Sequence, residues 1–190
     1  MKKLLIVLAG LALTSLACKK DEAKPTEAPK PAAAAPAAAA PAPVVPVKVE
    51  MKNLKVVAAG WEGEFNATLE GWTYEKYTPG KDGTNEPNRF YLDKFPEDRP
   101  TDAEGYAAKL KSDPNFQDMG SLFISVASTD KLPNGWLVTG VQKDMGDKDD
   151  KGSPAFVLYR ADLNVYCRGS VFKSEALRTE AIEGCKQLKP

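Results

Sequence analysis

The chain has 190 residues, enough for one folded domain with appendages. Its 26 basic and 26 acidic residues cancel, so no excess of positive charge favours binding to nucleic acid. It contains no histidine, which removes the commonest general base and the commonest metal ligand, so the sequence favours a non-enzymatic protein without a cofactor.

Residues 1–17 have the pattern of a secretory signal peptide. Lys2 and Lys3 precede an almost continuous apolar run, Leu4–Leu16, which is too short for a permanent membrane-spanning helix. The run ends in Leu13-Thr14-Ser15-Leu16-Ala17-Cys18, where small residues precede a cysteine. The pattern predicts export from the cytoplasm.

This segment resembles the lipobox of bacterial lipoproteins, in which the cysteine is lipidated and becomes the mature N-terminus. The resemblance implies a lipid anchor on Cys18 that holds the chain to a membrane of the cell envelope. The third residue before the cysteine is usually Leu in that family and is Ser15 here, so Ser15-Leu16-Ala17 also fits ordinary signal-peptidase cleavage. Lys19 stands where some inner-membrane lipoproteins carry aspartate, so we expect the outer membrane, on its periplasmic or surface face.

Residues 18–50 comprise the cysteine and an Ala/Pro-rich linker. Proline recurs every few residues between Pro25 and Pro46, which blocks helix propagation. Almost no large side chain precedes Val44, so little can be buried to offset the entropy of ordering. We expect a disordered tether that holds the domain away from the membrane and reaches roughly 90 Å when taut.

Residues 52–190 predict a single α+β domain. Apolar runs predict about eight short strands, at 54–59, 65–69, 72–77, 89–95, 119–127, 136–141, 155–160 and 163–168. Phe65, Ala67 and Leu69 alternate and are expected on one face of their strand. In the strand 89–95, the alternation predicts one face with Phe90, Leu92 and Lys94 and the opposite face with Tyr91, Asp93 and Phe95. Hairpin signals, among them Asn134-Gly135 with its preference for a type I′ turn, favour a mainly antiparallel sheet.

Two helices are expected to cover this sheet. Thr101 and Glu104 have the spacing of a capping box, and they open a helix with an apolar face of Ala103, Tyr106, Ala107 and Leu110. Ser174 is the expected N-cap of a final helix. Its apolar stripe, which should lie on the sheet, is Leu177, Ala181, Ile182, Cys185 and Leu188.

Cys167 and Cys185 are the two cysteines of the predicted domain. An even count in an exported chain favours a disulfide over two buried thiols. The pair can meet if Cys167 points with Val165 toward the final helix, and opposite to Tyr166. Loop-closure entropy assigns such a bridge roughly 3 kcal/mol of stability.

The order of these elements resembles the PsbP-like fold of photosystem assembly proteins and their bacterial relatives. The resemblance covers residues 60–188 and includes the pairs Gly71-Trp72 and Gly135-Trp136 and the closing strand and helix. It implies a non-enzymatic scaffold used for binding or assembly. Together with the predicted export signal, it makes another envelope protein the expected partner. It assigns no functional residue.

Asp147–Gly152 has part of the spacing of a calcium-binding loop. Lys151 occupies a position that needs an oxygen ligand, and Leu158 occupies the position of the bidentate Glu. A solvated acidic hairpin tip is therefore the favoured interpretation, and no metal site is assigned.

Trp61, Trp72 and Trp136 are candidates for lining a ligand groove, although aromatic side chains more often pack in a core.

The sequence leaves three functions, in order of preference. The first is a lipid-anchored envelope protein whose domain binds or scaffolds another protein. The second is an envelope binder of small ligands that uses the tryptophans. The third is an enzyme that uses carboxylates alone.

Overall fold

The computed structural model describes residues 47–80, 82–113, 116, 121–144, 151–170 and 172–189. The predicted signal peptide, Cys18, the predicted linker as far as residue 46 and residues 145–150 of the candidate calcium loop lie outside this part of the chain. The elements follow in the order η1 (Met51–Asn53), β1 (Glu62–Asn66), β2 (Gly71–Pro79), β3 (Asn85–Lys94), α1 (Ala103–Ser112), β4 (Ser121–Leu132), β5 (Gly135–Asp144), β6 (Ser153–Arg160), β7 (Val165–Gly169) and α2 (Glu175–Lys186).

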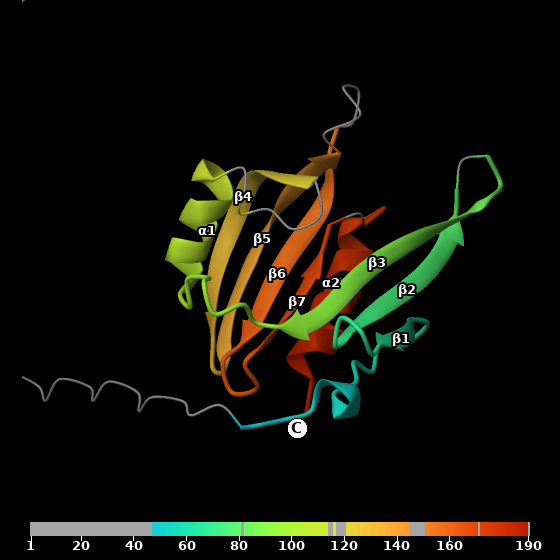
Figure 1. Ribbon diagram of the computed structural model, residues 1–190. Coiled ribbons are helices and arrows are strands. Elements are labelled where there is room, and N and C mark those ends of the chain that lie inside the picture. The colour runs from blue at the N-terminus through green and yellow to red at the C-terminus, as the bar shows by residue number, and fades with distance from the viewer. Residues whose placement is uncertain are drawn as a thin grey trace, which may run out of the picture. The chain divides into compact units, whose positions relative to one another are not determined.

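The strands form one antiparallel sheet in the order β1-β2-β3-β7-β6-β5-β4 (Figure 1). Two meanders, β1–β3 and β4–β7, are joined where β3 pairs with β7, in a register that sets Leu92 opposite Cys167. The segment that contains α1 carries the chain from β3 to β4 at the far edge. The predicted α+β class is confirmed, with seven described strands where the sequence predicts about eight.

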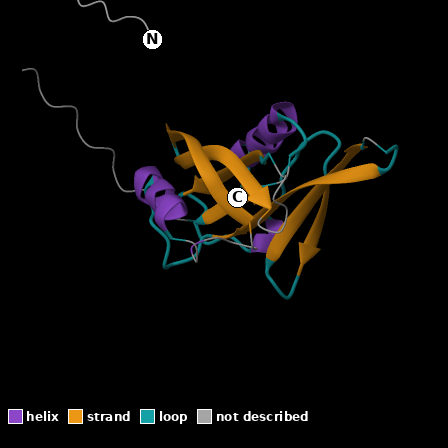
Figure 2. Cartoon of the chain, turned by 90° about the horizontal axis from the view of Figure 1, so that it is seen from above, coloured by secondary structure: helices purple, strands orange, loops and turns teal. Residues whose placement is uncertain are grey.

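The two faces of the sheet have separate apolar cores. Along β7, Val165 and Cys167 belong to one core and Tyr166 belongs to the other, because successive side chains of a strand alternate. α2 and the segment 47–61 cover the first face, here called the α2 face. α1 packs on β4 and β5 on the second face, called the α1 face, and the view from above shows the two helices well apart (Figure 2).

The N-cap of α1 lies one residue later than predicted. Asp102 is the N-cap, and its Oδ1 accepts the N–H of Gly105 at 2.6 Å. The predicted capping box at Thr101 is wrong, because Asp102 takes the N-cap position. Thr101 precedes the cap, and its carbonyl accepts the indole N–H of Trp136 at 2.9 Å. The predicted apolar face is buried as expected: Ala103, Tyr106, Ala107 and Leu110.

α2 has the predicted cap and the predicted stripe. The Ser174 hydroxyl accepts the N–H of Leu177 at 3.3 Å. All five stripe residues are buried against the sheet, and Cys185 is bonded to Cys167 on β7 with an S–S distance of 2.12 Å. Neither helix of the described part of the chain has the length and apolar character that a bilayer crossing requires.

The apolar run 54–59 is not a strand. Leu54 and Val56 are buried on the α2 face, and the N–H of Val56 donates to the hydroxyl of Tyr74 at 2.8 Å instead of to a neighbouring strand. A Cβ on Gly184 of α2 would lie 2.7 Å from Val56, so this glycine permits the close approach of the segment to the helix. Leu54 and Val56 are therefore buried because the segment packs on α2 and on the sheet face, not because it forms a strand.

The next predicted strand ends earlier than its alternation indicates. β1 stops at Asn66, because the Asn66 side chain accepts the N–H groups of Thr68 and Leu69 at 2.9 and 3.0 Å and closes a turn. Ala67 and Leu69 therefore lie outside the strand, and Leu69 is 75 % exposed. The expectation that they share a strand face with Phe65 is wrong.

The hairpin between β4 and β5 forms without the predicted type I′ turn. Its two loop residues are Pro133 and Asn134, and neither has the positive φ that this turn needs, since the proline ring fixes φ near −65°. Gly135 has φ +150°, and a Cβ there would lie 1.9 Å from the carbonyl oxygen of Tyr159. The glycine therefore serves the contact between β5 and β6.

Candidate functional site

The structure separates the three tryptophans of the candidate ligand groove. Trp61 and Trp72 lie on the α2 face, where their indole N–H groups donate to the Glu180 carboxylate at 3.3 Å and to the carbonyl of Met51 at 2.8 Å. Trp136 lies in the core of the α1 face and is 3 % exposed. The three rings do not line a common groove, and each packs among other apolar side chains.

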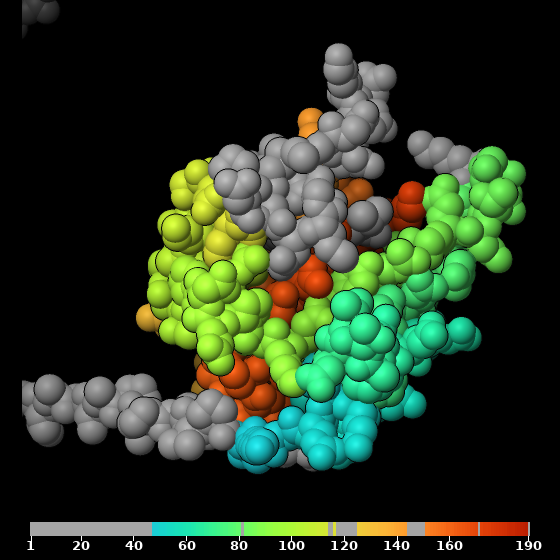
Figure 3. Space-filling view, viewed as in Figure 1, coloured from blue at the N-terminus to red at the C-terminus, as the bar shows by residue number. Residues whose placement is uncertain are grey.

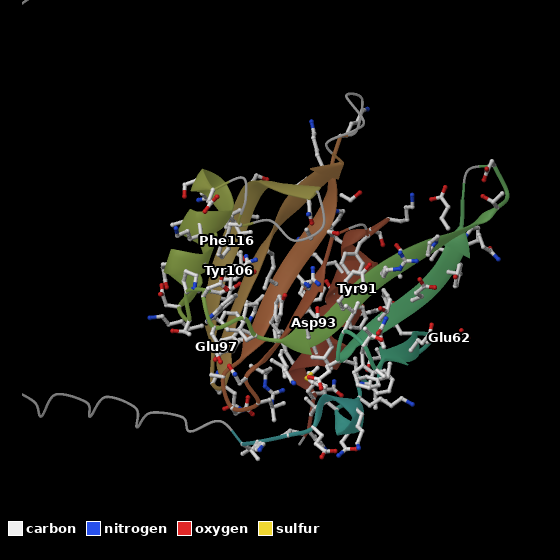
Figure 4. The ribbon with its side chains drawn as sticks, viewed as in Figure 1. Glu62, Tyr91, Asp93, Glu97, Tyr106 and Phe116 are labelled. Carbon is white, nitrogen blue, oxygen red and sulfur yellow. A yellow bond between two sulfur atoms is a disulfide. The ribbon has the colours of Figure 1, made fainter. Side chains whose placement is uncertain are left out.

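A polar surface lies on the α1 face of β1, β2, β3 and β7, away from β4 and β5, on which α1 packs. Nine of the polar side chains that alternation and register place there form one set, and none of the nine is buried. We call this set the open face; its members are Glu62, Glu64, Thr73, Glu75, Tyr77, Arg89, Tyr91, Asp93 and Arg168. In Figure 4, Tyr91 and Asp93 lie along β3 and Glu62 lies toward the β1 edge.

The centre of the open face is an ion pair between β7 and β3. Arg168 Nε donates to Asp93 Oδ2 at 3.0 Å, and the two side chains are 20 % and 23 % exposed. The guanidinium carbon also lies 5.2 Å from the ring centre of Tyr91 and 5.6 Å from that of Tyr166. Ion pairing and ring contacts together fix the arginine in one orientation.

Beside this centre, Glu75 holds two neighbours. Its carboxylate accepts the Tyr77 hydroxyl at 2.8 Å and Arg89 Nε at 2.7 Å. These two hydrogen bonds lower the pKa of Glu75, and the bond to the carboxylate raises the pKa of Tyr77. Tyr77 therefore remains a protonated donor at neutral pH, and its ring is presented to solvent, with the residue 55 % exposed.

Tyr77 and Arg89 lie on an arm formed by β2 and β3. β1 pairs with residues 71–75 and β7 with residues 90–94, so residues 76–79 and 85–89 pair only with each other. The hairpin extends beyond the neighbouring strands at the upper right of Figure 1. Asn88, fully buried at its base, donates to the carbonyl of Lys76 at 3.1 Å and accepts the N–H of Lys173 at 2.8 Å. These bonds tie the arm to the segment before α2.

Next to the open face, the space-filling view shows a hollow between α1 and β3, with atoms of β7 visible at its base (Figure 3). Figure 4 shows Tyr106 and Phe116 on the α1 side of the sheet and Tyr91 and Asp93 on the β3 side. Arg99 lies over the Phe116 ring, 3.9 Å from its centre, and also donates to the Phe116 carbonyl. The α1 side of this hollow thus carries buried rings under the Arg99 guanidinium, and the β3 side carries Tyr91 and the Arg168–Asp93 ion pair.

This arrangement is suited to recognition of another polar surface. It offers hydrogen-bond donors and acceptors of both charges in fixed positions, next to exposed aromatic area. Within the described ranges, no group of three Cys, Asp or Glu side chains is placed to hold a metal ion. Most of the candidate calcium loop lies outside those ranges, so the structure does not test it.

Sequence reasoning identified the strand that carries the site but not the site. It placed Tyr91, Asp93 and Phe95 on the face opposite Phe90 and Leu92, and the two cores confirm this for the buried members of the set. The partner of Asp93 lies 75 residues away, and no local pattern indicates it. A scan of known protein families and searches of curated proteins and of solved structures find nothing that matches this chain.

Proposed function

We propose that the chain is a lipid-anchored protein of the bacterial cell envelope whose domain is a non-catalytic binding or assembly module. The open face is the surface that contacts the partner, which is another envelope protein. The observation that carries the proposal is the fixed array of Tyr77, Glu75 and Arg89 next to the Arg168–Asp93 pair, none of it buried. The proposal agrees with the scaffold role that the PsbP-like resemblance implies.

The residue types of the open face favour a protein partner. Tyr and Arg are enriched among the residues that dominate protein–protein affinity. The hydrogen bond from Tyr77 to Glu75 restrains the tyrosine before binding, so less side-chain entropy is lost when a partner covers its ring. The projecting arm presents Tyr77 and Arg89 away from the rest of the sheet.

The compartment follows from the N-terminal sequence and from the bridge. Residues 1–17 have the pattern of an export signal, and Cys18 has the position of a lipidated cysteine. A disulfide between β7 and α2 agrees with an oxidising compartment. Lys19 favours the outer membrane over the inner one.

In-cell photocrosslinking of the full chain tests the binding surface. A benzophenone amino acid replaces Tyr77, and in a control chain it replaces Val57, an apolar residue of the α2 face that is 79 % exposed. We expect a discrete adduct with one envelope protein from position 77 that position 57 does not give, and Arg89→Gln should weaken it. Equal adducts from both positions, or none from position 77, would refute the proposed surface.

The anchor is tested by the mass of the mature N-terminus. We expect the purified chain to begin at Cys18 with the added mass of an acyl-modified cysteine. Cys18→Ala should leave the protein soluble or unprocessed, because no acyl group can be attached. A mature chain without lipid mass, or unchanged partitioning of Cys18→Ala into detergent, would contradict the anchor and favour ordinary secretion.

A further inference from the structure

A cleft of about 460 Å³ lies on the α2 face, beside the point where the linker joins the domain. Residues 48–52 form one wall, and the β1–β2 turn with Lys94 forms the other. The floor is apolar and includes Val49, Met51 and Phe65. The rim is charged and consists of Lys48, Glu50, Lys52, Glu70 and Lys94. This volume lies in the range of ligand sites in proteins.

The β1–β2 turn, whose Ala67 and Glu70 line the cleft, also holds an apolar side chain exposed to solvent. Asn66 accepts two N–H groups and thereby fixes the turn, and Glu70 completes it with φ +50°, which is uncommon for a residue with a side chain of this size. Leu69, between them, is 75 % exposed. Glu70 is also ion-paired with Lys94, which ties the turn to the end of β3. The exposure of Leu69 is thus built into an ordered turn.

The linker leaves the domain at this end. The N–H of Val47 donates to the carbonyl of Asp162 at 2.9 Å. Arg160 binds the Asp162 carboxylate and donates to the carbonyl of Leu188 at 3.0 Å, so Val47 and Leu188 both lie near the β6–β7 turn. Lys48 on the cleft rim follows Val47 directly, and the linker therefore emerges beside the cleft.

The rim lysines are able to exchange their partners. Lys52 pairs with Glu50 at 3.1 Å, with side chains 65 % and 69 % exposed, and Lys94 pairs with Glu70 at similar exposure. Ion pairs this exposed contribute little energy, so a phosphate can compete for the ammonium groups. Three lysines against two glutamates leave the rim with one net positive charge.

A weak site suffices because the chain keeps it close to the membrane. The linker between Cys18 and Val47 has 28 residues. A Pro-rich linker of that length reaches roughly 90 Å when taut, so the anchor keeps the domain near the membrane and raises its effective concentration there.

We propose that the cleft end of the domain docks on the phospholipid layer that holds the anchor. Leu69 enters the interface between headgroups and acyl chains, and Lys48, Lys52 and Lys94 bind lipid phosphates. This docking rests on the proposed lipid anchor. It orients the domain, so that the cleft end of the α2 face meets the membrane and the open face on the other side of the sheet is presented to the partner.

Quenching by brominated lipid tests the docking on the anchored full chain. An environment-sensitive dye is attached at Leu69→Cys on the β1–β2 turn, and in the matched control at Val57→Cys, which is similarly exposed but lies outside that turn and outside the cleft lining. In vesicles containing phosphatidylglycerol, we expect at least about twofold stronger quenching at position 69 than at position 57. Lys48→Gln with Lys52→Gln should reduce the difference, and so should high salt.

Equal quenching at the two positions, or none at position 69, would overturn the docking. Retention of the chain on vesicles is measured separately, and the loss of retention in Cys18→Ala reports the anchor. If the chain is not retained, the anchor has failed, and the same dye measurement is made on Cys18→Ala held to the vesicles by an N-terminal histidine tag and a nickel-chelating lipid. Quenching at position 69 then supports docking without the acyl group, and its absence refutes docking.

Discussion

At the scale of single residues, Arg160 is the most constrained charge of the described domain. The residue is 6 % exposed, and its guanidinium pairs with Asp162 at 2.7 Å. It also donates to the carbonyls of Cys185, Lys186 and Leu188 at 3.4, 2.9 and 3.0 Å. The last carbonyls of a helix have no partner within the helix, and the helix dipole favours a cation there. Arg160 therefore closes the C-terminal end of α2.

We expect Arg160→Met to lower the free energy of unfolding by about 3 kcal/mol. The change leaves the half-buried Asp162 carboxylate without its ion pair and the carbonyls at the end of α2 without their buried donor. Urea denaturation at neutral pH measures the loss. Arg168→Met is the matched control, since Arg168 is also ion-paired but its side chain is 20 % exposed, and its loss should be about 1 kcal/mol. Equal losses in the two variants would show that burial of the guanidinium does not matter.

At the scale of elements, β7 and α2 are joined more strongly than packing alone would join them. The Cys167–Cys185 bridge links the middle of β7 to the last turn of α2, and Arg160 on the adjacent strand binds the same helix end. The Ser174 cap orders the other end of the helix. With both ends of α2 held, the α2 face forms a stable support for the segment 47–61 and its cleft.

We expect the double variant Cys167→Ala, Cys185→Ala to unfold with roughly 3 kcal/mol less free energy than the wild type, because the open chain gains conformational entropy in the unfolded state. Denaturation with and without a reductant measures this. The reductant should lower the stability of the wild type by a similar amount and leave the double variant unchanged. A wild-type chain that loses no stability on full reduction would contradict the bridge as a source of stability.

At the scale of the whole described domain, one sheet separates the covered α2 face from the α1 face, which α1 covers only over β4 and β5. The α2 face is covered by a helix and an N-terminal segment, and these are tied together on the outside by Glu180, which accepts Lys76 Nζ at 2.6 Å and the Trp61 indole at 3.3 Å. The α1 face carries the open polar set. Ion pairs on both faces make the stability of the domain depend on pH.

The pKa of Glu180 is lowered from its usual 4.5, chiefly by the hydrogen bond from Lys76. As the pH falls below 4.5, Glu180 of the unfolded chain binds a proton before Glu180 of the folded chain does. Its contribution to the free energy of unfolding is therefore present above pH 4.5 and is lost as the pH falls through the lower pKa of the folded state. We expect Glu180→Gln to flatten the fall in unfolding free energy with acid, measured by urea titrations at several pH values.

Lys76→Met should flatten the acid dependence in the same way, because it removes the main cause of the lowered pKa. The double variant should then show little further change, since both single changes break one interaction. An acid dependence that both variants leave intact would place the relevant carboxylates elsewhere.

The sequence indicates local properties correctly where a single periodicity decides them. The α2 stripe, the Ser174 cap and the orientation of Cys167 opposite to Tyr166 all follow from helical or strand spacing. The strand predictions at 54–59 and, beyond Asn66, at 65–69 are wrong because apolar residues alternate there for reasons other than strand pairing. Leu54 and Val56 alternate because they pack against a helix and a sheet face, and Asn66 ends β1 by a side-chain bond that apolar periodicity does not register.

The sequence by itself determined the class of fold, the two helices, the face on which the cysteines meet and the candidate export signal. Only the tertiary structure decided that β3 pairs with β7, and with that pairing came the Arg168–Asp93 centre of the open face. It likewise brought residues 48–52 against the β1–β2 turn to form the cleft. The physical reason is that side-chain periodicity is a property of the local backbone. Which distant edges meet depends instead on how both apolar faces of the sheet are buried at once.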